Sequence, residues 1–567
     1  MVVSGPKDYQ FDAIVVGTGM SGGWALKALC EAGLRTLALE RGRMVEHGAG
    51  YVTEHKGPWE VPGRGRVPPE VAERDYPVQR RTFAFSEYTR HFFAKDSVYP
   101  IVEEEPFTWI QTDVVGGRTL LWGRQAYRWS PQDFLANRDD GHGVDWPLRY
   151  EDLAPWYDHV EREIGVSGSR EGLVQLPDGI FQRPMELHAV ERHARDRIEA
   201  AFPGRRMIIG RTATLTEPLG ARAPCHYCGP CERGCSTGSY YSTQSVCLPA
   251  ARATGNLTLR PDAVVESVLW DDVRGQARGV RVIDARTREA TEYEARVIFL
   301  CASSMGTARI LLHSRSERFP GGMGNDSGTL GRFLMEHHAR VGARGRVDGF
   351  ADRYYQGNRP NGVYVPRFRN LDAATRHPGF LRGYGLQGGA SRMRWSRGQG
   401  MRGFGADFKR EVSRPGPWTL SLQAYGEVLP HQDNRCTLDA EVTDAYGIPA
   451  LRFHFPRRAN ELAMRQDMAA TAAEMLEAAG ARDVESYDLA DVPPGTANHE
   501  MGGARMGRDP RTSVLDAHHR CHAVPNLFVT DGACMTSSAC QNPSLTYLAL
   551  TARACDHAVT LLARGEL

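Results

Sequence analysis

The sequence predicts an α/β plus α+β protein, in which a discontinuous Rossmann-like domain is interrupted by an inserted domain with an antiparallel sheet. Three observations predict this. The chain opens with a strand, a glycine turn, a helix and a second strand that ends in an acid. A strand, a small-residue turn and a helix then recur twice, in the middle and at the end of the chain. Between these two returns lie segments of alternating polarity, such as WTLSLQAYGEVL and ALRFHFP, which are typical of a sheet with one wet face.

The opening unit, AIVVGTGMSGGWALKALCEAGLRTLALERG, has the spacing of a dinucleotide-binding motif. Gly17 allows a sharp turn out of the first strand, Gly19 allows backbone to approach a pyrophosphate, and Gly22 allows the helix to pack closely on the strand. The N-terminus of the helix then faces the phosphates. Glu40 ends the next strand, where a carboxylate can accept hydrogen bonds from an adenosine ribose. The motif therefore predicts a flavin or nicotinamide enzyme, with FAD or NAD favoured over NADP.

Two later segments are expected to complete this domain. The first has a buried strand from Val297 to Cys301 and a helix that starts at Gly306. The second has a strand from Leu527 to Thr530, the turn Asp531-Gly532 and a long amphipathic helix that begins at Pro543, just after an asparagine.

These segments set the expected domain boundaries. A chain of 567 residues is too long for one compact core. We expect a cofactor domain made of residues 1–335 and 492–567, with a substrate domain at 336–491. The Gly- and Arg-rich stretch from Gly379 to Gly405 is predicted to be a long loop or a mobile lid.

Charge and hydropathy exclude several classes of protein. The net charge is +1 and no basic block occurs, which gives no reason to expect nucleic-acid binding. No apolar run approaches the length of a membrane helix, and the start MVVSGPKDYQ lacks the features of a secretory signal.

Four of the twelve cysteines are crowded into CHYCGPCERGC, where Cys225, Cys228, Cys231 and Cys235 have the spacing C-x2-C-x2-C-x3-C. This spacing is typical of iron–sulfur ligands, whereas structural zinc usually uses two separated pairs. Zinc, a redox disulfide pair and reduced structural thiols stay open as alternatives, as does a three-iron cluster held by three of the four. The other cysteines are dispersed along the chain, and we expect them to be buried free thiols.

Taken together, these motifs resemble the glucose–methanol–choline (GMC) family of FAD oxidoreductases almost from end to end. The matching segments are VVGTGMSGGWALKALCEAG with Glu40, DVVGGRTLLWGRQAYRWSPQDF, DWPLRYEDLAPWYDHVEREIGVSG, GRFLMEHH, HEMGGARMG and TDGACMTSSACQNPSLTYLALTARA. The cysteine run before TGSYYSTQS resembles the catalytic subunits of bacterial FAD glucose dehydrogenase and glucoside 3-dehydrogenase. The resemblance implies a 3Fe–4S cluster, favoured over 4Fe–4S, on Cys225, Cys231 and Cys235, with Cys228 as an extra thiol.

The resemblance also implies how FAD is held. Some members attach FAD covalently to a histidine near the glycine turn after the second strand, but Val114 to Gly123 contains none, so we expect non-covalent FAD. Gly116 and Gly117 are expected to bring backbone against the isoalloxazine ring or the phosphates, with a structural tight turn as the alternative. The remaining expected cofactor contacts are Val264 at the adenine, Asp531 and Gly532 at the pyrophosphate, and Pro543.

The same resemblance, together with the chemistry of alcohol oxidation, predicts the catalytic residues. A base must take the hydroxyl proton while a hydride moves to the flavin. His499, which opens HEMGGARMG, is the expected base, because a neutral imidazole can accept a proton near neutral pH. Asn542 falls on the second family position, where an amide orients the hydroxyl without titrating. His337 and His338 are expected to be structural or to line the pocket.

The motifs and the resemblance together predict an FAD-dependent sugar or glycoside dehydrogenase whose electrons leave through an iron–sulfur cluster. The resemblance around the cysteine run implies oxidation at the 3-position. An external cytochrome or quinone acceptor is implied. So is a small partner subunit that carries an export signal, which places the protein in the periplasm, with the cytoplasm as the simpler alternative. An oxygen-using pyranose or C-glycoside oxidase, a zinc- or thiol-stapled variant without a cluster, and a non-catalytic electron-transfer subunit remain as alternatives.

Overall fold

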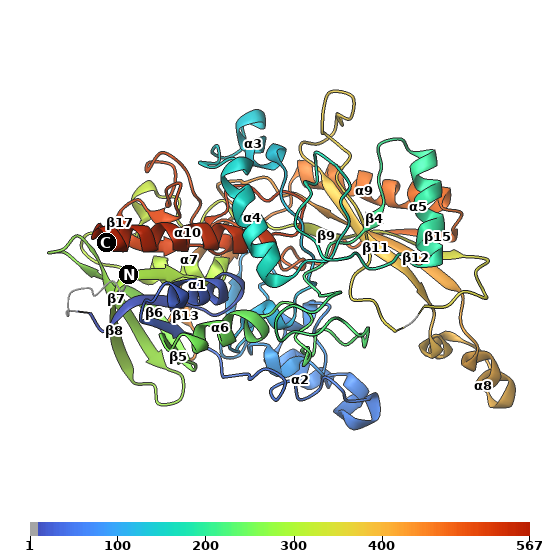
Figure 1. Ribbon diagram of the computed structural model, residues 1–567, viewed down its shortest axis with the longest axis horizontal. Coiled ribbons are helices and arrows are strands. Elements are labelled where there is room, and N and C mark those ends of the chain that lie inside the picture. The colour runs from blue at the N-terminus through green and yellow to red at the C-terminus, as the bar shows by residue number, and fades with distance from the viewer. Residues whose placement is uncertain (1–8, 356) are drawn as a thin grey trace.

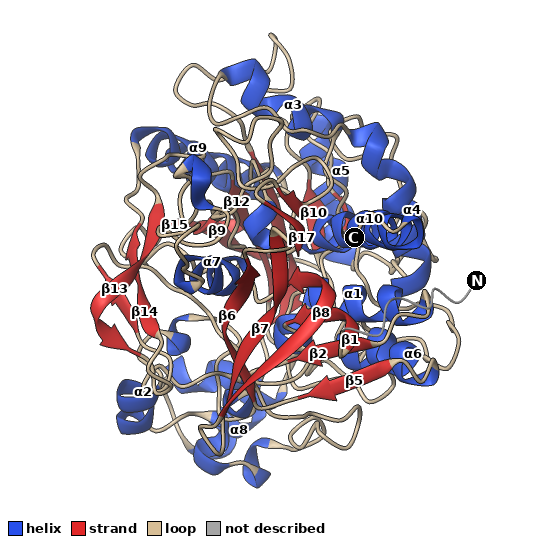
Figure 2. Ribbon diagram, turned by 90° about the vertical axis from the view of Figure 1, so that its left-hand side faces the viewer, coloured by secondary structure: helices blue, strands red, loops and turns tan. Residues whose placement is uncertain are grey.

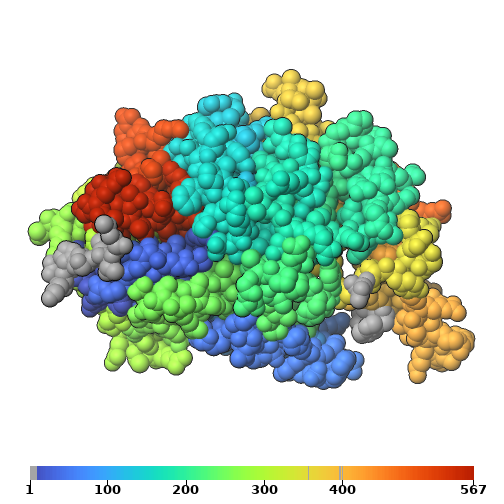
Figure 3. Space-filling view, viewed as in Figure 1, coloured from blue at the N-terminus to red at the C-terminus, as the bar shows by residue number. Residues whose placement is uncertain are grey.

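The structure is a computed structural model that describes residues 9–355 and 357–567. Two sheets organise the chain, one toward the end that carries both termini and the other toward the opposite end (Figure 1). The C-terminal segment, red in Figure 3, lies against the N-terminal segment, blue. Within the described residues, no helix has an apolar stretch long enough to span a bilayer.

The first sheet has the strand order β16-β17-β8-β1-β2-β5. Its strands are β1 (Phe11–Val16), β2 (Thr36–Leu39), β5 (Leu257–Arg260), β8 (Ala290–Leu300), β16 (Arg520–Cys521) and β17 (Val524–Val529). From β17 to β5 the neighbours are parallel, while β6 (Ala263–Asp271) and β7 (Gln276–Asp284) extend β8 as an antiparallel ribbon. The parallel strands are nearly continuous apolar runs because helices cover the sheet.

Helices α1 (Met20–Glu31) and α10 (Ser544–Arg564) pack against each other beside this sheet. The Ser21 hydroxyl of α1 donates to the carbonyl of Thr530 at the end of β17, so the two ends of the chain are also joined by a hydrogen bond. Helix α7 (Ser304–His313) begins two residues before the predicted start at Gly306. It lies between the first sheet and the hairpin of β13 (Arg435–Thr443) and β14 (Pro449–His454) (Figure 2).

The second sheet has the order β15-β9-β12-β11-β10-β4 and is antiparallel. Its strands are β4 (Ile208–Ile209), β9 (His338–Val347), β10 (Val363–Val365), β11 (Tyr384–Arg392), β12 (Trp418–Gly426) and β15 (Arg482–Asp488). Helices α5 (Ala189–Ala201) and α9 (Ala459–Ala478) cover one face and bury its aliphatic side chains. All of these strands except β4 come from residues 338–488, and β14 instead pairs with β3 (Ile101–Glu103). The remaining α-helices are α2 (Pro69–Asp75), α3 (Pro131–Asp140), α4 (Tyr150–Ile164), α6 (Leu248–Ala253) and α8 (Gly405–Ser413).

The prediction of a loop or mobile lid from Gly379 to Gly405 is wrong at residues 384–392, because β11 occupies them and pairs with β10 and β12. Glycines in this strand serve close packing rather than flexibility. A Cβ added to Gly388 would lie 1.9 Å from the carbonyl oxygen of Ser421 on the neighbouring strand. Glycine inside a strand is a mark of such close backbone approach.

Candidate active site

A cavity of about 340 Å³ lies between the two sheets and is lined by residues from nearly the whole length of the chain. Ten of the predicted site residues line it: Gly17, Gly19, Glu40, Gly117, Val264, His499, Asp531, Gly532, Asn542 and Pro543. Gly22, Gly116 and the cysteines of the CHYCGPCERGC run do not. The cavity therefore joins the expected cofactor residues to the expected catalytic pair.

The glycine turn leaves room for a ligand at the start of α1. Gly17 has φ +89°, and a Cβ on it would lie 2.4 Å from the carbonyl oxygen of Cys301, while a Cβ on Gly22 would lie 1.9 Å from the carbonyl oxygen of Gly17. A Cβ on Gly19 would instead meet no atom within 4 Å. The first turn of α1 carries no acidic residue, so its amides and dipole are free to bind an anion. This end of the cavity fits a pyrophosphate.

Glu40 both braces this turn and faces the cavity. One carboxylate oxygen accepts from the Thr18 amide at 3.1 Å and the Thr18 hydroxyl at 2.7 Å, and the other accepts from the Gly42 amide at 3.1 Å. Burial raises the pKa of Glu40. These bonds leave acceptor capacity on the carboxylate for a ribose hydroxyl. The residues at this end together fit the adenosine diphosphate part of a dinucleotide.

Gly116 and Gly117 have different surroundings. Gly116 has φ +88°, donates its amide to the Thr18 hydroxyl at 2.8 Å, and leaves no space for a Cβ beside Gln244. Gly116 therefore forms part of a tight structural turn. Gly117 lines the cavity, and a Cβ on it would lie 3.4 Å from the Cα of Gly19, so its backbone is the part of this turn that can meet a cofactor.

Asp531 follows the C-terminal end of β17 and lines the cavity. Its carboxylate accepts from the Thr307 hydroxyl of α7 at 2.5 Å and from the Ala533 amide at 2.9 Å. Burial raises the pKa of Asp531 to about 6. From Asp531 onward, residues 531–543 are all buried, and this single segment ends at Asn542 and Pro543 beside His499.

The expected catalytic pair, His499 and Asn542, belongs to a hydrogen-bonded row whose proton positions follow from one backbone carbonyl. His337 Nε2 lies 3.1 Å from the carbonyl oxygen of Ser538, which can only accept, so His337 carries its proton on Nε2. Its Nδ1 is then a lone pair, which lies 2.9 Å from His499 Nδ1. His499 must therefore carry its own proton on Nδ1, and its Nε2 is a lone pair. Asn542 Nδ2 lies 3.2 Å from that Nε2 and donates to it.

Burial keeps both histidines neutral. It lowers the pKa of His337 to about 4 and that of His499 well below its usual 6.5, with His337 and Arg118 adding to the second shift. A neutral imidazole with an unprotonated Nε2 inside a cavity can accept a proton. The row also gives His337 a place that the sequence did not reveal, because it contacts His499 directly and sets its tautomer.

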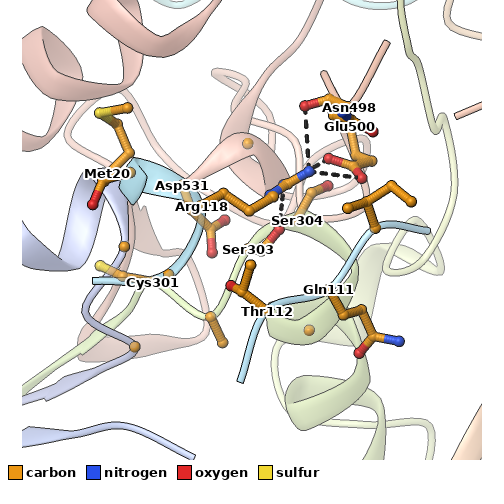
Figure 4. A pocket seen from close by; sticks show the side chains of 18 of the residues that line it. Met20, Gln111, Thr112, Arg118, Cys301, Ser303, Ser304, Asn498, Glu500 and Asp531 are labelled. Atoms are coloured by element: carbon orange, nitrogen blue, oxygen red, sulfur yellow. Dashed lines mark hydrogen bonds and ion pairs between the residues drawn. The ribbon is translucent and has the colours of Figure 1, made fainter. Parts of the chain in front are cut away.

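Two further groups fix the backbone that carries His499. Arg118 pairs with Glu500 at 2.7 Å and donates to the carbonyl of Asn498 and the hydroxyl of Ser303 (Figure 4). Glu336 accepts from the Gly495 amide at 3.2 Å, and burial beside Glu500 raises its pKa to about 8. Sequence reasoning missed these residues individually. The signal was present, since Arg118, Glu336 and Glu500 lie inside three of the segments that carry the family resemblance.

The predicted metal ligands lie outside the cavity. Cys228 is exposed and the other three are partly buried, and the Tyr227 amide donates to Cys225 Sγ at 3.4 Å. Burial raises the pKa of Cys231 to about 12. Across the described residues, no three His, Cys, Asp or Glu side chains are arranged to hold a metal ion, so the structure does not bring these thiols together as a formed site.

The cysteine segment nevertheless borders the cavity wall. Arg124 contacts Glu232 of this segment at 3.5 Å and donates to the carbonyl of Trp122 at 2.6 Å. Trp122 itself lines the cavity. Arg124 therefore links the cysteine segment to the backbone of a residue that lines the cavity.

Comparisons with known proteins agree with this geometry. Family models described as GMC oxidoreductase match residues 215–339 and 430–551. The chain is 29% identical to 2-methyl-1,2-propanediol dehydrogenase of Mycolicibacterium austroafricanum, over 97% of this chain and 95% of that protein. It is 25% identical to the fructose dehydrogenase large subunit of Gluconobacter japonicus, over 98% of both. It is 26% identical to 6'''-hydroxyparomomycin C oxidase of Streptomyces lividus, over 96% of this chain and 90% of that protein.

A solved structure of formate oxidase from Aspergillus oryzae, whose description concerns FAD modification, shares the fold with a TM-score of 0.62 and 13% identity, over 99% of both chains. The predicted fold, with its FAD-binding and antiparallel-sheet parts, is thus confirmed. The chain belongs to the GMC oxidoreductases, the family of FAD enzymes that oxidise sugar and alcohol CH–OH groups.

Proposed function

We propose that this protein oxidises a hydroxyl group of a sugar or glycoside, with His499 as the base. The observation that carries the proposal is the unprotonated Nε2 of a neutral His499, which lies in the cavity and accepts a hydrogen bond from the amide of Asn542. When bound, FAD supplies the acceptor for the hydrogen and the electron pair that leave the carbon. The cradle around Gly19 and Glu40 would hold its adenosine and pyrophosphate.

His499, Asn542 and His337 have different roles in the proposed reaction. When a substrate binds, its hydroxyl replaces the Asn542 Nδ2–H at the single lone pair of His499 Nε2, which takes the hydroxyl proton. Asn542 Nδ2 then donates to the hydroxyl oxygen and orients it. The proton gives His499 a positive charge, and its Nδ1–H then makes a charge-assisted hydrogen bond to His337. His337 does not touch the substrate, so it is a positioning residue.

The named substrates of the relatives favour a polyhydroxylated alcohol. The Mycolicibacterium relative is named for a diol and the Gluconobacter relative for fructose. The cavity matches such substrates with amide and hydroxyl groups, because Gln125, Gln387 and Tyr425 line it together with His499. A preference for the 3-position of a glucoside, as in glucoside 3-dehydrogenase, is part of the proposal and rests on the cysteine run alone.

We further propose that electrons leave through the cysteine segment to a cytochrome or quinone acceptor, with a partner subunit that brings the chain to the periplasm. The nearness of Cys225–Cys235 to Trp122 through Arg124 supports this exit. Because the thiols are not gathered, holding iron requires this segment to rearrange around the metal, as metal binding often demands. Iron analysis and electron paramagnetic resonance of anaerobically purified protein, with fractionation of the cells, test these points.

A second candidate is an oxidase that passes electrons directly to oxygen, since the Streptomyces relative is named an oxidase. The same fold would serve, and no cluster would be needed. Flavin without iron, together with peroxide formed at the rate of substrate oxidation, would favour this candidate.

The central experiment is anaerobic mixing of the FAD-loaded protein with glucose, a glucoside and other polyhydroxy alcohols, followed by flavin absorbance. We expect bleaching with at least one sugar or glycoside. His499→Ala should retain FAD but lose bleaching, while the exposed His55→Ala should behave like the parent protein. Full bleaching by His499→Ala would remove the proposed base.

A further inference from the structure

The hydrogen-bonded row continues beyond Asn542 to a residue of the second sheet. Because Asn542 turns its NH2 group to His499, its Oδ1 faces the other way, and Gln387 Nε2 donates to it at 2.5 Å. An amide carries its oxygen opposite its nitrogen, so the orientation of Gln387 is also fixed. The Ser538 carbonyl therefore determines the orientation of four side chains in succession: His337, His499, Asn542 and Gln387.

The free end of this row is an acceptor in the cavity. Gln387 lies on β11 between Leu386 and Gly388, and Leu386 points into the core under α9, so Gln387 points to the opposite face of the sheet. Gln387 lines the cavity with His499 and Asn542. Among the described residues, nothing donates a hydrogen bond to Gln387 Oε1, whereas Nε2 is committed to Asn542.

Gln125 on the cavity wall is oriented the opposite way to Gln387, because its oxygen and not its NH2 group is already hydrogen-bonded. Its Oε1 accepts from the Tyr127 hydroxyl at 2.7 Å, which leaves its NH2 group as the part that can meet a ligand. The site thus presents an acceptor from Gln387 and a donor from Gln125. A substrate with several hydroxyl groups can satisfy both, because each hydroxyl donates and accepts.

We propose that Gln387 is a specificity-determining residue, whose Oε1 accepts a hydrogen bond from the hydroxyl on the carbon next to the one that is oxidised. The reacting hydroxyl must lie at His499 Nε2 and Asn542 Nδ2, and Gln387 is the next group along the row, in contact with the same asparagine. The enzyme then requires a vicinal diol arrangement rather than a lone alcohol. This inference rests on the proposed function and specifies the neighbouring hydroxyl as the substrate group that the site recognises.

The test compares one good substrate of the FAD-loaded enzyme with its analogue that lacks the neighbouring hydroxyl. For the parent protein, kcat/KM should fall about 10- to 100-fold with the deoxy analogue, because the amide oxygen loses its partner in a dry site. In Gln387→Met, which keeps the length of the side chain without the acceptor, the two substrates should be used within about threefold of each other. Gln132→Met is the matched control, because Gln132 does not line the cavity and its side chain donates to the carbonyl of Asn370; this variant should discriminate like the parent.

Three outcomes separate the possibilities. If Gln387 only holds Asn542 in place, Gln387→Met lowers kcat/KM for both substrates by the same factor, the ratio stays as in the parent, and the inference is wrong. A parent enzyme that uses the deoxy analogue equally well also overturns it. If no polyhydroxy alcohol reduces the flavin of the parent, the proposed function itself fails. Flavin content and thermal stability of Gln387→Met show whether the fold is intact.

Discussion

Replacing His337 by Leu tests whether a neighbour sets the tautomer of the proposed base, His499. The change removes the acceptor for the His499 Nδ1–H, which now lies 2.9 Å away, and leaves the Ser538 carbonyl without its donor. The proton of His499 is then free to move to Nε2, where it blocks the lone pair that must take the substrate proton. Loss of FAD binding is not expected, since His337 does not line the cavity.

The size of the effect follows from the bond that is lost. A buried group without its partner costs about 1–3 kcal/mol, which corresponds to about 5- to 150-fold in the rate of flavin reduction. KM should change little, because His337 does not contact the substrate. The assay is anaerobic stopped-flow absorbance of the flavin across a range of substrate concentrations.

The conservative variant His337→Asn is the control. An asparagine Oδ1 can occupy the place of the imidazole Nδ1 and accept from His499, so this variant should recover most of the rate. A His337→Leu enzyme that reduces its flavin at the parent rate, with the parent pH dependence, would show that the row does not control the base.

Other changes probe separate parts of the site. Gly19→Val, which fills the open space at the start of α1, should abolish FAD binding and leave circular dichroism unchanged; retained flavin would contradict the cradle. Because the pKa of His499 is lowered well below 6.5, the rate of flavin reduction should stay flat from pH 8 to about pH 6, and a fall near 6.5 would contradict the burial of the base. Since the pKa of Glu336 is raised from 4.5 to about 8, the native state keeps a proton that the unfolded state releases, so the free energy of unfolding falls as pH rises through this window; Glu336→Gln should flatten that slope in pH-dependent denaturation. Cys228→Ser should retain iron and Cys231→Ser should lose it, if a three-iron cluster forms; equal iron in both would rule that ligand set out.

The cofactor half of the fold could be predicted because its signals are local. The strand expected to lead into Glu40 is found at Thr36–Leu39, since a buried apolar run between a helix and an acid allows few alternatives. The second sheet was predicted only in outline. Strand β4 joins its edge from more than a hundred residues upstream, and β11 is rich in glycine, so neither local pattern nor propensity indicates them.

The candidate active site, like the fold, could be predicted from the sequence only in part. His499 and Asn542 were expected from the family resemblance, and the structure brings them into contact. The role of His337 could not be derived, because it depends on a contact across 162 positions of sequence and on which nitrogen faces the Ser538 carbonyl. Burial and tautomer are properties of the assembled core, whereas a motif only states which side chains are available.

The buried run 531–543 has a consequence for how this enzyme is inactivated by heat. The run is anchored to α7 at one end by Asp531 and to the second sheet at the other by Asn542. Because no residue of this segment is exposed, we expect it to unfold as one cooperative unit and not residue by residue. Release of the yellow chromophore and loss of turnover should therefore share a single melting transition.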